Sequence, residues 1–81
     1  MSTQSLSLAQ TEMGETVKIS GLNTDGAMRR RLQDIGFTAG TSVQRLQSGP
    51  AGDPTAFYIK GTVIALRRED SACILVERIE T

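Results

Sequence analysis

Histidine and tryptophan are absent from this sequence, and cysteine occurs once. Without histidine, neither a histidine-based catalytic triad nor an imidazole-ligated zinc site can be built. One cysteine cannot form an internal disulfide, so the chain is not a disulfide scaffold, and a reducing compartment is the simpler interpretation. Aromatic residues make up only 4% of the chain, which leaves few side chains that could stack on nucleic-acid bases.

The chain also lacks an excess of either charge and any long apolar run. Nine Lys and Arg balance nine Asp and Glu, and zero net charge argues against general nucleic-acid binding. The longest apolar runs, 63–66 and 72–76, are far shorter than the roughly 20 residues that span a bilayer. The first ten residues lack the features of a secretory signal. With 81 residues, the chain is one small domain, too small to enclose a deep active site.

Hydrophobic periodicity predicts a mainly β protein of about five strands and one helix. Alternating or continuous apolar residues indicate strands. We expect them over residues 15–22, 41–47, 56–60, 62–67 and 74–79. Met28, Leu32 and Ile35 share one face of a helix over 25–35, and residues 69–72 are expected to form a short 3₁₀ turn. Five short strands favour a small barrel, because closure removes most exposed edges.

Glycine marks the expected connections. Gly36 is typical of a helix C-terminus in the left-handed conformation, and Phe37 would then pack back on Leu32. Gly40 supplies a tight turn and Gly61 a sharp bend between two strands. Because the segment 63–66 is apolar on both faces, we expect it to be central in the sheet. Val43 and Leu46 do not share a period-two phase, which a β-bulge would explain.

The predicted core contains apolar residues from every element. They are Val17, Ile19, Leu22, Met28, Leu32, Ile35, Phe37, Val43, Leu46, Phe57, Ile59, Val63, Leu66, Ile74, Leu75, Val76 and Ile79. Residues 1–5 are expected to be a flexible N-terminus, and residues 6–81 a single domain. Leu6 and Leu8 could still tuck against this domain.

Several short motifs occur in a familiar order and spacing. They are Arg30-Arg31-Leu32, Asp34-Ile35-Gly36-Phe37, Ala39-Gly40-Thr41, Gly52-Asp53-Pro54, Ile59-Lys60-Gly61 and the segment 65–76. Together they resemble the signature of the ferrous iron transport protein A (FeoA) family, over roughly residues 6–79. Ala39 stands where that family usually has proline, which should loosen the turn slightly without changing the fold.

The resemblance implies an SH3-like β-barrel and a regulatory, non-enzymatic role in bacterial ferrous iron uptake. The expected partner is the cytosolic part of a membrane iron permease with a GTP-binding domain. The protein would then be cytoplasmic, and its partner would recruit it to the inner face of the membrane. One alternative is a free-standing, metal-responsive regulatory barrel similar to the C-terminal domain of metal-dependent repressors. A small-barrel nucleic-acid binder is a third reading, and no DNA partner is expected.

Two arginine clusters are the candidate partner contacts: Arg29 and Arg30 on the helix, and Arg67 and Arg68 at a strand end. The competing interpretation is two solvated faces, with Arg29 paired to Asp25 and Arg30 to Asp34 on the helix. Exposed strand edges would also allow weak self-association.

The sequence predicts no catalytic residues, no cofactor and no specific metal site. Cys73 has no recognisable ligand partners and is interpreted as a buried, inert side chain. Direct binding of Fe²⁺ or another divalent ion, through carboxylates such as Glu69 and Asp70, would be weak because their spacing forms no known site.

Overall fold

The computed structural model describes residues 6–79, and six short strands dominate it. The strands are β1 (Leu6–Ser7), β2 (Thr16–Leu22), β3 (Ser42–Ser48), β4 (Thr55–Ile59), β5 (Thr62–Leu66) and β6 (Ile74–Arg78). The helical segments are η1 (Leu8–Gln10), α1 (Gly26–Ile35), η2 (Pro50–Gly52) and α2 (Arg68–Ser71). The predicted flexible segment 1–5 lies outside the described residues, as do residues 80 and 81.

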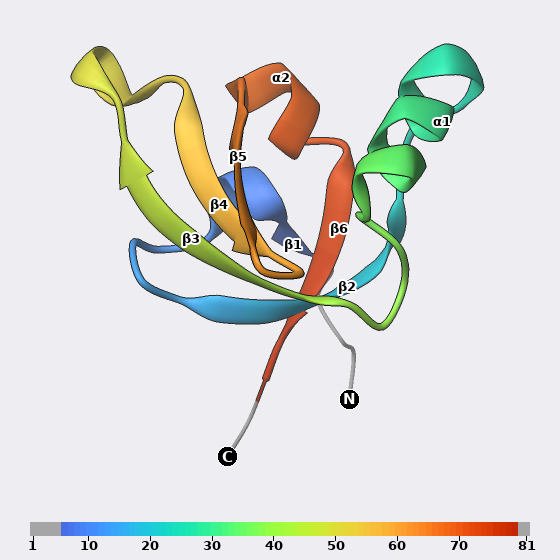
Figure 1. Cartoon of the computed structure of the whole chain (residues 1–81), viewed down its shortest axis with the longest axis horizontal. Coiled ribbons are helices and arrows are strands. Elements are labelled where there is room, and N and C mark those ends of the chain that lie inside the picture. Colours follow the sequence, from blue (N-terminus) through green and yellow to red (C-terminus); the bar gives the residue numbers. More distant parts are fainter. Residues whose placement is uncertain (1–5, 80–81) are drawn as a thin grey trace.

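All six strands form one antiparallel sheet in the order β1-β6-β2-β3-β4-β5 (Figure 1). The register shifts within β2 between Ile19 and Gly21, and within β3 between Arg45 and Ser48. Such irregularities bend a strand and increase its twist, so the sheet curls around its inner face. The phases of Val43 and Leu46 predicted a β-bulge in β3, and the register shift between Arg45 and Ser48 confirms this irregularity.

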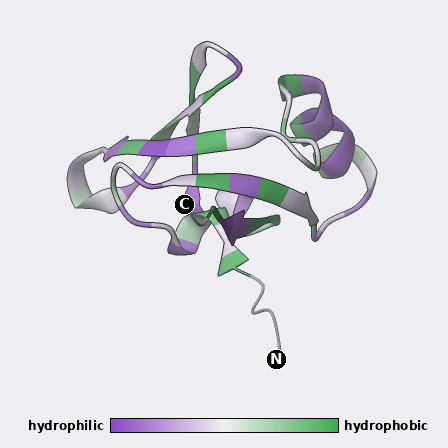
Figure 2. Ribbon diagram, turned by 90° about the horizontal axis from the view of Figure 1, so that it is seen from below, coloured by the Kyte–Doolittle hydropathy of each residue, from purple (hydrophilic) through white to green (hydrophobic). Residues whose placement is uncertain are grey.

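Apolar side chains on the inner face of the curled sheet form the core. The buried members are Leu8, Val17, Ile19, Leu32, Phe37, Val43, Phe57, Ile59, Leu66, Ile74 and Val76. Figure 2 shows the corresponding alternation of hydrophobic and hydrophilic residues along the strands. All of these except Leu8 were predicted core residues, whereas Val63 and Ile79 were predicted wrongly, being 57% and 44% exposed.

The strand β5 lies at an edge of the sheet, so the prediction of a central position is wrong. Its pairing with β4 directs Ile64 and Leu66 to the side that Phe57 and Thr55 occupy, and Val63 to the side of Tyr58. Val63 and Tyr58 are both exposed. An apolar run therefore did not indicate burial on both faces here, because the outward half of the run faces solvent.

The helix α1 ends as the sequence predicts. Gly36 adopts φ 124°, and the backbone N–H of Phe37 donates to Leu32 O at 3.0 Å. These bonds satisfy carbonyls that the end of a helix leaves without partners, and they place Phe37 in the core with no exposed surface. Beyond it, Gly40 has φ 90° in a turn that is closed by Thr41 N–H donating to Thr38 O.

The segment predicted as a 3₁₀ turn over 69–72 is instead the single α-helical turn α2, one residue earlier. The N–H groups of Ser71 and Ala72 donate four residues back, to Arg67 O and Arg68 O. Ser71 Oγ lies within 3.3 Å of both carbonyl oxygens. This side-chain contact and the burial of Ser71 stabilise an α-helical turn here in place of the tighter 3₁₀ turn.

Candidate interaction surfaces

Arg29, Arg30 and Arg31 of α1 are all exposed. Arg29 and Arg30 line one open hollow with Gly26, Ala27 and Gln33. The predicted ion pairs of Arg29 with Asp25 and Arg30 with Asp34 do not form; within residues 6–79 the one ion pair joins Arg78 to Glu15. Arg29 Nη1 donates instead to Leu22 O at 3.4 Å. The helix therefore presents guanidinium groups that form no ion pair with an acidic side chain among the described residues.

In the second arginine cluster, Arg67 and Arg68 have different roles at the start of α2. Arg67 caps α2, and its carbonyl oxygen accepts from Asp70 N–H and Ser71 N–H. Arg68 donates its backbone N–H to Asp53 Oδ1 at 2.9 Å, and its side chain lines a hollow that contains no α1 residue. No hydrogen bond or ion pair between described residues connects the two arginine clusters, and the hollows that Arg30 and Arg68 line share no residue.

A third exposed surface runs across the outer face of the sheet. Successive strand pairings align Thr16 with Gln44, Gln44 with Tyr58, and Tyr58 with Val63. All of these except Val63 border an open hollow of about 500 Å³, which Lys60 and Gly61 also line. Gly61 has φ 81° and Lys60 φ 50°, the backbone of a two-residue hairpin turn with both residues at positive φ. This turn confirms the predicted bend at Gly61.

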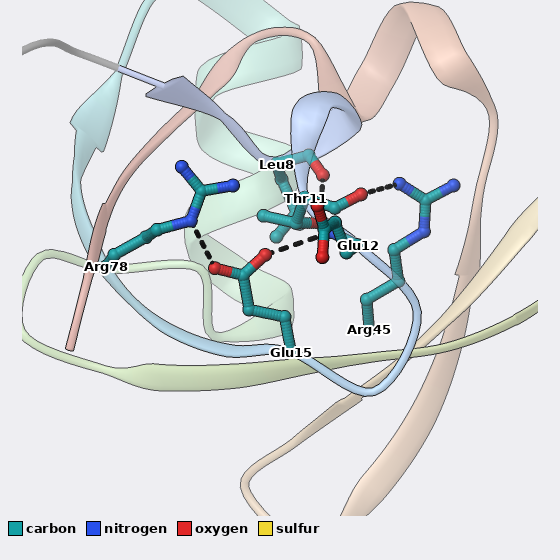
Figure 3. A network of polar contacts seen from close by, with 6 residues as sticks. All are labelled: Leu8, Thr11, Glu12, Glu15, Arg45 and Arg78. Atoms are coloured by element: carbon teal, nitrogen blue, oxygen red, sulfur yellow. Dashed lines mark hydrogen bonds and ion pairs between the residues drawn. The ribbon is translucent and has the colours of Figure 1, made fainter. Parts of the chain in front are cut away.

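A polar network ties the segment after η1 to the sheet (Figure 3). Glu15 Oε1 accepts the backbone N–H of Glu12 at 2.9 Å, and Glu15 Oε2 accepts from Arg78 Nε at 2.5 Å. The Glu12 N–H is the main cause, and Arg78 the second, of a pKa of Glu15 below its ordinary value. From the other side, Arg45 Nη1 donates to Thr11 O. Sequence reasoning missed this network because Glu15 and Arg78 lie 63 residues apart.

Cys73 is partly buried, and its Sγ contacts Glu69 O at 3.4 Å. Across residues 6–79, no group of three or more Cys, Asp or Glu side chains is placed to hold a metal ion. In the same part of the chain, no helix is long and apolar enough to cross a membrane.

The FeoA domain model matches residues 6–78, which is nearly all of the structure just described. The chain belongs to the FeoA domain family. The resemblance noted in the sequence is thereby confirmed, and the SH3-like fold that it implied is confirmed with it. The FeoA-like protein from Clostridium acetobutylicum superimposes with a TM-score of 0.88 at 30% identity, covering 100% of this chain and 93% of that one.

A curated relative connects the family to a transporter. The Fe(2+) transport protein A/Fe(2+) transporter FeoB fusion protein of Porphyromonas gingivalis is 32% identical over 74 residues. The match covers 91% of this chain and only 9% of that protein. The expected likeness to metal-dependent repressors is confirmed for the fold alone. A manganese-dependent transcriptional repressor superimposes with a TM-score of 0.84 at 16% identity, covering 98% of this chain and 44% of that one.

Proposed function

We propose that this FeoA domain is a cytoplasmic accessory of ferrous iron uptake that binds the cytosolic part of a FeoB-type permease. The fusion protein of Porphyromonas gingivalis carries this proposal, since it joins a similar segment and the transporter in one polypeptide. Fusion holds a domain beside its partner at high effective concentration. A separate chain has to supply the same proximity through a binding surface of its own.

The exposed face of α1 is the surface that we assign to this contact. Arg29 and Arg30 line an open hollow and lack acidic partners among residues 6–79. On the adjacent side of α1, a second hollow is bordered by Arg30, Arg31, Asp34 and the partly buried Ile35. Within residues 6–79, Asp34 forms no ion pair with either arginine. A surface of this kind suits an acidic patch that also offers an apolar side chain. Arginine is enriched at protein interfaces because its stem packs while its head makes polar contacts.

Titration of the permease's cytosolic domain with this protein by isothermal titration calorimetry tests the proposal. We expect saturable 1:1 binding that weakens as salt is raised, because exposed charges are screened beyond about 10 Å at 0.1 M salt. The variant Arg29→Gln/Arg30→Gln should bind roughly 3- to 10-fold more weakly at low salt, as rim charges chiefly affect association.

The matched control is Arg67→Gln/Arg68→Gln, which removes the same charge from α2 and should bind like the wild type. Absence of binding by the folded wild-type protein would reject the accessory function. Equal weakening by both double variants would retain the function but reject α1 as its surface.

A further inference from the structure

At one end of the curled sheet lies a small hollow that combines two arginines with two buried hydroxyl groups. It is lined by Ala9, Arg45, Gly52, Thr55, Phe57, Arg68 and Ser71, and its volume is about 110 Å³. Among the residues that the structure describes, no Asp or Glu side chain belongs to this lining. The carboxylate of Asp53 accepts from the backbone N–H of Arg68 at 2.9 Å rather than from its guanidinium.

The position of Arg45 makes this hollow unusual. Arg45 is paired with Phe57 in the register of β3 and β4, and Phe57 is fully buried. Arg45 therefore projects from the side of the strand that carries the core, and its side chain is partly buried. A guanidinium does not lose its proton in a protein, so a permanent positive charge is built into this end of the barrel.

The partners of Arg45 hold its guanidinium in place without neutralising it. Nη1 donates to Ala9 O at 3.3 Å and also to Thr11 O, and Nη2 donates to Ser48 Oγ at 3.3 Å. All three acceptors are uncharged. Because the five N–H groups of arginine exceed these three bonds, donor capacity remains. Among the described residues no acidic side chain pairs with Arg45, and its charge is held by these bonds in a hollow that the exposed Arg68 also lines. Arg45 is therefore a preorganised half of an anion site.

The hydroxyl groups of Ser48 and Thr55 continue the hydrogen-bond chain that begins at Arg45. Thr55 Oγ1 lies 2.9 Å from Ser48 Oγ, and Thr55 is 6% exposed. Since Ser48 Oγ already accepts from Arg45, Ser48 can direct its own proton to Thr55. That orientation leaves the proton of Thr55 for a ligand in the hollow.

We propose that this hollow binds a phosphate group between Arg45 and Arg68. Its volume equals that of about three or four water molecules at roughly 30 Å³ each. That space accommodates one tetrahedral oxyanion and is well below the roughly 300–1,000 Å³ typical of larger ligands. Two guanidinium groups and a hydroxyl match the charge and the several acceptor oxygens of phosphate. This site is separate from the α1 surface and does not depend on permease binding.

Titration with inorganic phosphate, followed by ¹H–¹⁵N NMR with sodium chloride at matched ionic strength as the reference, tests the proposal. We expect saturable shifts at the amides of Arg68 and Ser71 and at the Nε–H of Arg45, with phosphate only. Arg68→Gln, which alters an exposed side chain, should weaken phosphate binding at least about tenfold, the value of one charge-assisted hydrogen bond. Arg30→Gln removes an arginine from a different hollow and should leave the affinity unchanged.

A parallel titration with phenyl phosphate distinguishes the two sources of the group. Binding of the monoester with similar affinity would identify the occupant as a phosphate carried by a larger molecule; binding of inorganic phosphate alone would identify the free ion. Arg45→Gln should abolish both responses, with its fold verified by circular dichroism. Shifts that do not saturate, that chloride reproduces, or that Arg68→Gln and Arg30→Gln reduce equally would overturn the proposal.

Discussion

Truncation of Leu8 to alanine should destabilise the domain severely, although Leu8 lies only three residues into the described chain. Leu8 belongs to the short η1 turn and has 0% exposed surface, as complete a burial as Phe37 or Phe57. Replacing a buried leucine by alanine removes its transfer free energy and leaves a cavity, at a cost of about 2–5 kcal/mol. An 81-residue domain has only about 4–12 kcal/mol of stability in total. Leu8→Ala should therefore remove at least about a sixth of it.

Urea unfolding followed by far-ultraviolet circular dichroism measures this change, since the chain has no tryptophan for fluorescence. A loss of about 3 kcal/mol should also lower the melting temperature by roughly 12–24 °C in a domain of this size. The control is Met13→Ala, because Met13 is 69% exposed and its truncation should change stability by less than about 0.5 kcal/mol. A loss below about 1 kcal/mol for Leu8→Ala would show that η1 does not close the core.

Three further substitutions test the network, the hairpin and the sheet edge. Glu15→Gln should cost about 1 kcal/mol or less at pH 7. The pKa of Glu15 is lowered below 4.5 in the folded state, so its carboxylate stabilises the fold above that pH and ceases to do so as the pH falls through the folded pKa. The wild-type and Glu15→Gln unfolding curves should converge below that pKa, and a constant difference would contradict this. Gly61→Ala, at φ 81°, should cost about 1–2 kcal/mol in urea unfolding, whereas Lys60→Gly should cost nothing; equal losses would exclude positive φ as the cause. Val63→Lys should reduce any self-association seen by analytical ultracentrifugation, because a charge on an edge strand opposes pairing with a second chain, and an unchanged sedimentation profile of an associating protein would exclude the β5 edge.

Local sequence chemistry accounts for the elements that the sequence predicted well. The apolar spacing of Met28, Leu32 and Ile35 predicts the face of α1, and Gly36 predicts its end, because both depend on residues within about one turn of one another. The strand β2 followed from its period-two alternation, and β6 from its run of apolar residues. Each of these elements can be recognised from its own residues.

The errors concern features that only the assembled sheet decides. The position of β5 at an edge depends on the strand order, which the apolar segment 63–66 does not encode. Leu8 seemed peripheral because it lies near the start of the chain, yet η1 packs against β6 and α2. Arg45 occupies an inward position in phase with Val43, and its partners at Ala9 and Thr11 lie more than 30 residues away. No local pattern could have revealed either contact.

The net charge of the whole chain is zero, but its individual surfaces are not each neutral. Among residues 6–79, Glu15 is paired with Arg78, while the arginines of α1 and Arg45 have no acidic partner. The two positive sites differ in exposure, since Arg29 and Arg30 are exposed and Arg45 is partly buried. Because salt screens exposed charges more than partly buried ones, permease binding through α1 should decline more steeply with sodium chloride than phosphate binding at the Arg45 hollow. Comparing how steeply the two affinities decline with sodium chloride would distinguish binding at α1 from binding at the Arg45 hollow, even where one substitution weakens both.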